Sequence, residues 1–291
     1  MSTATVPERT IAAPPVHRRR LDWVVGSLRG YAALAYIFLF APILVVVIYS
    51  FNAGRFLINW DHFGTDWYGT AVANRGITGA LRTSVVVALV NAVVAVLIGM
   101  FAGIALARRS GRWRQPFLIL VFLILVAPEI VDAIAYLIFF VRIGIDWGFA
   151  RLVIGHSVFN SAVVALIVRA RLEGLDESLE EAAADLGATP SRTFRQITLP
   201  LMLPAVIAGG LLSFTFSLDD VIISSFVTTS GFTTLPVYVF SALRTGLKGD
   251  LAAISTITLA GTLIALAVTF FVLRRSGESA EGVVTTITGT G

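Results

Sequence analysis

The chain contains no cysteine, one lysine and three histidines in 291 residues. Without cysteine it forms neither disulfides nor thiolate-ligated metal sites. The histidines (His17, His62 and His156) lack metal-ligand spacing, so the sequence predicts no metal site. A Walker A loop needs a Gly-Lys pair followed by Ser or Thr, but the single lysine, Lys248, follows Leu247. We therefore expect no cofactor bound by this chain and no standard phosphate-binding loop.

Charge is scarce as well. Charged residues make up 14% of the chain and hydrophobic residues 56%, with a mean hydropathy of +0.85. Soluble domains carry about 25% charged residues, so the composition indicates a membrane protein. Apolar runs long enough to cross a bilayer, which takes about 20 residues, occur six times. The sequence therefore predicts an all-α polytopic protein with transmembrane helices near residues 31–51, 80–107, 116–141, 152–169, 200–227 and 251–273.

The placement of basic residues predicts the orientation in the membrane. Lys and Arg are enriched in loops that stay in the cytoplasm. Counted from Arg18 onward, seven basic residues fall in the segments assigned to the outside, and fourteen fall in those assigned to the inside: Arg18, Arg19, Arg20, Arg29, Arg108, Arg109, Arg112, Arg114, Arg169, Arg171, Arg192, Arg195, Arg274 and Arg275. We therefore expect both termini in the cytoplasm, and topology explains the arginines better than nucleic-acid binding. The expected organisation is an N-terminal tail (1–30), a transmembrane domain (31–275) and a C-terminal tail (276–291).

A polar insert at residues 171–199 separates the fourth and fifth apolar runs. Asp176 and Ser178 compete as the N-cap of a first helix, and Ser178 with Glu181 fits a capping box. Gly187 suits a left-handed C-cap, and Thr189-Pro190 suits the cap and first position of a second helix. The insert is therefore predicted to form a short helical hairpin.

The hairpin carries a motif. Glu181-Ala182-Ala183 is followed by Gly187 and then by Ile197-Thr198-Leu199-Pro200. This pattern, EAA-x3-G-x9-I-x-L-P, resembles the cytoplasmic coupling loop of permease subunits in ATP-binding-cassette importers. In that family the loop sits in a cleft of the ATPase subunit and moves as a rigid lever. An ordinary amphipathic connection between two spans is the alternative.

This resemblance implies a type I importer permease core in the inner membrane. It implies partners as well: a second permease subunit, two ATPase subunits that use ATP and Mg, a solute-binding protein outside, and membrane lipid. The chain itself is expected to have no catalytic residue. The residues that the resemblance assigns to coupling are Glu181, Ala182, Ala183, Gly187, Ile197, Leu199 and Pro200.

Four acids interrupt the apolar runs: Glu129 and Asp132 in the third, Asp219 and Asp220 in the fifth. An ionised side chain near the bilayer centre costs about 2.5–3.5 kcal/mol on insertion scales, so these acids are candidates for function. Helical rise places them roughly 20–29 Å from the inner start of their spans, in the outer half of the membrane. An acidic pathway for a cation is one interpretation. The other is structural, with the acids satisfied by backbone amides, Arg82 or Arg142.

Two more features predict local geometry. Gly99 and Gly103 are four residues apart, a spacing that lets helices approach closely in membranes. Pro128 precedes Glu129 directly and is predicted to kink the third span beside that acid.

The stretch from Ser217 to Val227, followed by Thr234-Leu235-Pro236, resembles the second permease of spermidine/putrescine importers. Pro128-Glu129-Ile130-Val131 also resembles that group, which more often has aspartate after the proline. The resemblance implies polyamine import by alternating access.

Other cargoes and other classes stay open. The same architecture serves thiamine, ferric iron or an oxyanion, although the acids would repel an anion. An ion-driven carrier could use the acids as a proton relay but leaves the hairpin motif unexplained. An intramembrane enzyme would need a paired nucleophile and base, or clustered histidines. His156 stands alone in its run and is predicted to be a hydrogen-bonded packing residue.

Overall fold

The computed structural model describes residues 18–54, 59–246 and 248–275, which form two units, Met1–Ile48 and Tyr49–Gly291. In these described ranges the regular elements are helices, with one isolated antiparallel bridge between Asn52 and Phe63. The all-α prediction is therefore confirmed. Of the two predicted tails, residues 1–17 and 276–291 lie outside the described residues.

The first unit contains α1 (Arg18–Tyr49), whose last residue already belongs to the second unit. The helix starts inside the segment predicted as a tail, because Trp23, Val25 and Leu28 extend its apolar character toward the N-terminus. These three side chains are exposed within the chain. An apolar helix surface of this kind needs lipid or a partner to cover it.

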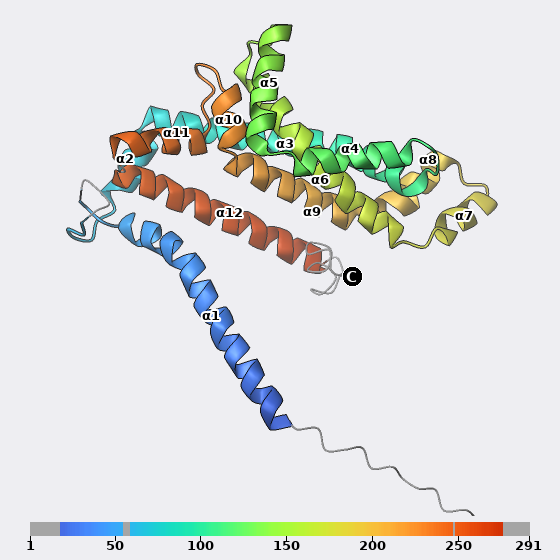
Figure 1. Ribbon diagram of the computed structural model, residues 1–291, viewed down its shortest axis with the longest axis horizontal. Helices are drawn as coiled ribbons and strands as arrows, with labels where there is room; N and C mark the ends of the chain where they lie inside the picture. Colours follow the sequence, from blue (N-terminus) through green and yellow to red (C-terminus); the bar gives the residue numbers. More distant parts are fainter. Residues whose placement is uncertain (1–17, 55–58, 247, 276–291) are drawn as a thin grey trace, which may run out of the picture. The chain divides into compact units, whose positions relative to one another are not determined.

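The second unit is built around three long helices, α3, α6 and α9, which pack against one another (Figure 1). The remaining helices surround them or form the loops. In chain order the elements are α2 (Asp66–Ala73), α3 (Arg75–Arg108), α4 (Arg114–Val126), α5 (Glu129–Ile143), α6 (Gly148–Glu173), α7 (Ser178–Asp185), α8 (Pro190–Thr193), the π-helical turn η1 (Phe194–Thr198), α9 (Leu199–Asp219), α10 (Ile222–Val227), α11 (Leu235–Ala242), the 3-10 turn η2 (Leu243–Thr245) and α12 (Gly249–Arg275).

Helices α3 and α6 approach each other closely at the two predicted glycines. A Cβ atom at Gly99 would lie 2.5 Å from Cβ of Val164 and 2.7 Å from the carbonyl oxygen of Ser161. One at Gly103 would lie 2.7 Å from the carbonyl oxygen of Ala165. The backbones can approach this closely only because both positions lack a side chain, so the predicted packing role is confirmed.

The helices support a membrane-spanning core. Four segments in the described part of the chain are each long and apolar enough to cross a bilayer: Val25–Tyr49, Arg75–Arg108, Gly148–Glu173 and Pro190–Asp219. The bent pair α4 and α5 counts as one further candidate, and the described apolar part of α12, Gly249–Ile264, is shorter. The predicted six-span arrangement is consistent with these segments.

Two predicted spans are broken rather than continuous. The run 116–141 splits into α4 and α5, which meet at 104°. Ala127 has the extended backbone that a following proline favours, and Pro128 cannot continue the ladder of α4. The run 200–227 ends at Asp219, because Asp220 has an extended conformation (φ −63°, ψ 123°) before α10 begins. The bend predicted at Pro128 is therefore confirmed, as a full break between α4 and α5, whereas the continuous helix predicted over 200–227 is wrong.

Candidate functional site

A cavity of about 530 Å³ lies where the two broken spans meet α6. Phe159 of α6 and Phe216 of α9 contribute aromatic walls. All four predicted pathway acids line this one cavity, although the two pairs are about 90 residues apart in the sequence. The polar and charged residues around the cavity are Glu129, Asp132, His156, Asn160, Asp219 and Asp220.

The helix breaks explain why the acids gather here. Glu129 and Asp132 occupy the first turn of α5, where the positive end of the helix dipole stabilises a carboxylate. Asp219 ends α9, and Asp220 lies between α9 and α10. Because each break interrupts a span, it exposes helix ends inside the apolar region and turns the acids toward a shared space.

Asp220 is buried and bound by protein groups. Its Oδ1 atom accepts a hydrogen bond from the backbone N–H of Ser224 (2.7 Å) and lies 3.3 Å from Nε2 of His156. The other ring nitrogen of His156, Nδ1, lies 2.7 Å from Oγ of Ser217. The side chains of His156 and Asp220 are 1% and 8% exposed. His156 is hydrogen-bonded, as predicted, but its carboxylate partner lies 64 residues away in sequence and was missed.

Glu129 and Asp219 are the more accessible acids. Both are exposed. Asp219 borders a second cavity of about 550 Å³ between α9, α11 and α12. Within the described ranges, no ion pair joins the four acids to Arg82 or Arg142. The structural interpretation is therefore supported only for Asp220, through the amide of Ser224.

Asn160 is a site residue that the sequence did not single out. Its side chain is 2% exposed and lines the cavity from α6. In the described part of the chain its Oδ1 atom has no hydrogen-bond partner. A buried acceptor without a partner carries a desolvation penalty, which a donor on a ligand would relieve. The sequence around Asn160 did not indicate a ligand site, because an asparagine in a membrane helix more often forms a hydrogen bond with another helix.

The other group of predicted residues lies at the opposite end of α9, in the helical hairpin α7–α8. Gly187 has φ +80°, and Thr189 occupies the N-cap position of α8, without a side-chain cap, with Pro190 at the first position, so both placements are confirmed. Neither predicted N-cap is right, and the capping box is wrong, because Ser178 is the first residue of α7 and Glu177 occupies the N-cap position without a side-chain cap. The Oδ1 atom of Asp176, one residue further out, accepts the backbone N–H of Ser178 (2.9 Å), which holds the pKa of Asp176 below its ordinary value.

The hairpin presents its motif outward. No residue of α7 is buried, and Glu181 and Ala182 are exposed. Leu179 is 48% exposed and Leu186 is 89% exposed. Small residues together with exposed leucines on a polar element form a surface suited to another protein.

The second half of the motif joins the hairpin to α9. Helix α8, η1 and α9 run on without interruption from Pro190 to Asp219. Pro200 lacks an N–H, and its ring crowds the carbonyl of Gln196 four residues earlier, so the helix widens there into the π turn. Leu199 packs against the cluster that contains Leu172 and Met202, while Ile197 is partly buried. The hairpin is thus continuous with the helix that ends at the cavity.

The chain is also similar to known proteins. Residues 95–275 match the family described as "Binding-protein-dependent transport system inner membrane component". The chain belongs to this family. It is therefore a permease subunit of the inner membrane and has no catalytic role of its own. The resemblance carried by the hairpin motif is confirmed.

Two relatives from Escherichia coli strain K12 are similar over most of their length. The putrescine transport system permease protein PotI is 38% identical over 251 residues, covering 84% of this chain and 89% of PotI. The spermidine/putrescine transport system permease protein PotC is 38% identical over 235 residues, covering 81% and 89%.

A solved structure shares the fold. It is a bacterial alginate ABC transporter in complex with an alginate pentasaccharide-bound periplasmic protein, with a TM-score of 0.72 at 14% identity over 89% of this chain and 97% of that one.

Proposed function

We propose that this permease carries polyamines such as putrescine and spermidine into the cytoplasm by alternating access. The observation that carries the proposal is the acidic cavity at the two helix breaks. The relatives PotI and PotC are named as putrescine and spermidine/putrescine permeases, which supports the same class of cargo.

The chemistry of the cavity fits a linear polyamine. Glu129, Asp132 and Asp219 approach it from two different helix breaks, so they can bind two ammonium groups separated by methylenes. Phe159 and Phe216 offer apolar surface to the methylenes and aromatic faces to a cation. A volume of about 530 Å³ lies within the usual range for small-ligand sites. An anionic cargo would be repelled by the same carboxylates.

The hairpin supplies the proposed connection to energy. Glu181, Ala182, Ala183 and Gly187 form the part that docks on the ATPase, and Ile197, Leu199 and Pro200 fasten it to α9. The helix from Pro190 to Asp219 has 30 residues, so it spans about 45 Å from the hairpin to the cavity. A movement of the hairpin therefore displaces Asp219.

The assembled transporter would consist of this chain, a second permease, two ATPase subunits that use ATP and Mg, and a solute-binding protein. In this proposal residues 31–275 form the permease domain, and both termini lie in the cytoplasm with the hairpin. The deciding experiment reconstitutes the complete transporter in liposomes and measures ATP-dependent uptake of labelled putrescine and spermidine. Thiamine, ferric iron and sulfate serve as competing cargoes. Uptake that persists without ATPase subunits under a proton gradient would support an ion-driven carrier instead.

Asp219→Asn tests the acidic cavity. Hydrogen bonds to charged groups contribute about 1.5–3 kcal/mol, so putrescine uptake is expected to fall by about tenfold or more. Initial uptake rates in proteoliposomes check this, with the amount of assembled complex measured alongside. Asp61→Asn, which removes an exposed carboxylate outside the cavity, is the matched control. Unchanged polyamine uptake by the Asp219 variant would refute the charge role.

Gly187→Ala tests the hairpin. The positive φ at this position costs an alanine about 1–2 kcal/mol, and the hairpin relaxes away from its docking geometry. We expect ATP-dependent uptake to fall several-fold. Gly144→Ala is the control, because Gly144 also ends a helix at positive φ (+72°) and neither glycine has a neighbour within 4 Å of an added Cβ. Equal losses in both variants would attribute the effect to strain alone.

A further inference from the structure

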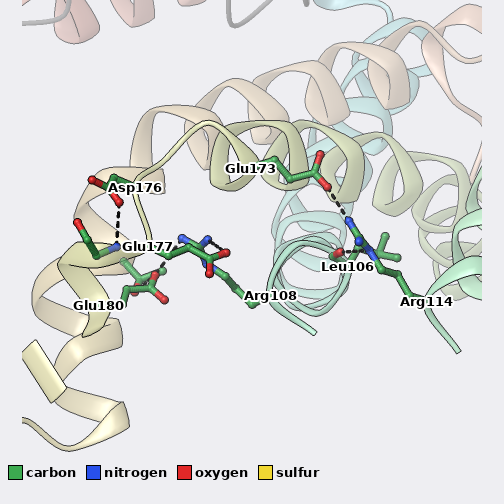
Figure 2. Close-up of polar contacts among 9 residues, drawn as sticks. Leu106, Arg108, Arg114, Glu173, Asp176, Glu177 and Glu180 are labelled. Carbon is green, nitrogen blue, oxygen red and sulfur yellow. Dashed lines mark hydrogen bonds and ion pairs between the residues drawn. The ribbon is translucent and has the colours of Figure 1, made fainter. Parts of the chain in front are cut away.

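Arg108, the last residue of α3, reaches across to the hairpin (Figure 2). Its Nη1 donates to Oε1 of Glu177 (2.7 Å), and its Nη2 donates to Oε1 of Glu180 (3.2 Å). Glu177 precedes α7, and Glu180 lies in its first turn. The hydroxyl of Thr198, in the π turn before α9, donates to the same oxygen of Glu180 (3.0 Å). Four polar side chains thus join the end of α3, the start of α7 and the foot of α9.

This cluster is more than a solvated surface pair. The side chain of Arg108 is 16% exposed, that of Glu180 is 28% exposed, and Thr198 is buried. In the described residues the buried Nε of Arg108 has no hydrogen-bond partner. The guanidinium therefore binds the two carboxylates through Nη1 and Nη2 and leaves its third nitrogen without a hydrogen bond. The planar fork of arginine allows it to hold two separate acids in a fixed geometry.

Glu180 and the first residue of the motif, Glu181, have different surroundings. Glu180 is held inside the cluster, whereas Glu181 is exposed and forms no ion pair within the described ranges. Arg114, at the start of α4, makes a different connection, since it binds Glu173 at the end of α6 (2.8 Å) and the carbonyl of Leu106 (2.9 Å). Of these two arginines, Arg108 is therefore the one that contacts α7.

We propose that Arg108 is a positioning residue that clamps the hairpin to α3, so that α7, α3 and α9 move as one body when the ATPase acts. The inference rests on the proposed coupling role of the hairpin. Helix α3 packs along α6 and α9, and α6 and α9 carry His156, Asn160 and Asp219 at the cavity. Without the clamp, α7 can tilt at Asp176 and Gly187 while the membrane helices stay in place.

The test uses the complete transporter reconstituted in liposomes, and it measures ATP hydrolysis and putrescine uptake together. For Arg108→Gln we expect assembly and ATP hydrolysis to persist, with uptake per ATP hydrolysed falling about tenfold. Glu180→Gln should give the same loss, and the double variant should lose no more, because both changes open one contact. Arg109→Gln removes the exposed charge next door, outside the clamp, and should behave as wild type.

Arg108→Lys should recover part of the ratio, since it keeps the charge without the fork. A simple loss of folding would lower assembly and hydrolysis together and leave the ratio intact, which would overturn the proposal. Glu181→Arg and Gly187→Ala distinguish the proposed clamp from the proposed coupling role of the hairpin on which it rests. If they uncouple the transporter and Arg108→Gln does not, only the clamp is wrong. If neither alters ATPase assembly or uptake, the coupling role of the hairpin fails and the clamp fails with it.

Discussion

Gly99→Val is expected to destabilise the transmembrane core by more than about 3 kcal/mol, the upper end of the cost of overpacking. The first added carbon would lie 2.5 Å from Cβ of Val164 and 2.7 Å from the carbonyl oxygen of Ser161. Both atoms are fixed to the backbone of α6, so no rotation of a side chain relieves the overlap. The helices must separate instead, and membrane helices associate chiefly through such close packing.

The measurement is thermal unfolding of the purified protein in detergent, together with the yield of folded protein. Gly79→Val is the control on the same helix, because an added Cβ at Gly79 has no neighbour within 4 Å. A surface substitution of this kind stays within about 0.5 kcal/mol of the parent. Equal stability of the Gly99 and Gly79 variants would contradict the close approach of α3 and α6.

His156→Leu is expected to cost about 1–3 kcal/mol, the range for leaving a buried polar group without its hydrogen-bond partner. The leucine leaves the carboxylate of Asp220, which is 8% exposed, without the ring nitrogen 3.3 Å away. It also removes the hydrogen-bond partner that Ser217 has in the ring. Since Asp220 separates α9 from α10, we expect the break between these helices to loosen first.

A double-mutant cycle identifies the cause. Adding Asp220→Asn to His156→Leu removes the unpaired charge, so the double variant should be more stable than His156→Leu alone. Thermal unfolding in detergent measures all three variants. His62→Leu is the matched control, because that histidine pairs with Asp61 at the surface with both side chains about 70% exposed. A double variant that is less stable than His156→Leu would show that packing, not the pair, determines the loss.

Some local features were predictable because neighbours in the sequence determine them. Gly187 adopts positive φ and Thr189-Pro190 starts a helix, since turn and cap chemistry acts over a few residues. The exact start of α7 was not predictable from residue type, because Asp176 and Ser178 both offer a side-chain oxygen at a suitable place. The backbone path instead puts Glu177 at the N-cap position and lets Asp176 accept the N–H of Ser178.

Other features depend on groups far away in the chain. Asp219 and Asp220 have different backbone conformations, because α9 ends at Asp219 and Asp220 is extended. The contact between Asp220 and His156 requires α6 to lie beside the α9–α10 break. Arg108 served in the sequence only as a marker of the cytoplasmic side. Its contact with the hairpin depends on the position of α7 across from the end of α3.

The sequence by itself determined the membrane class, the hairpin and the family, because hydropathy and a motif with fixed spacing are written along the chain. It also identified the acids, since a carboxylate in an apolar run is costly wherever the helix lies. The tertiary structure alone decided that Asp220 interrupts the fifth predicted span, that Glu129 and Asp219 share a cavity, and that Arg108 contacts the hairpin. The physical reason is that these outcomes depend on distances between helices, and packing of α3, α6 and α9 sets those distances.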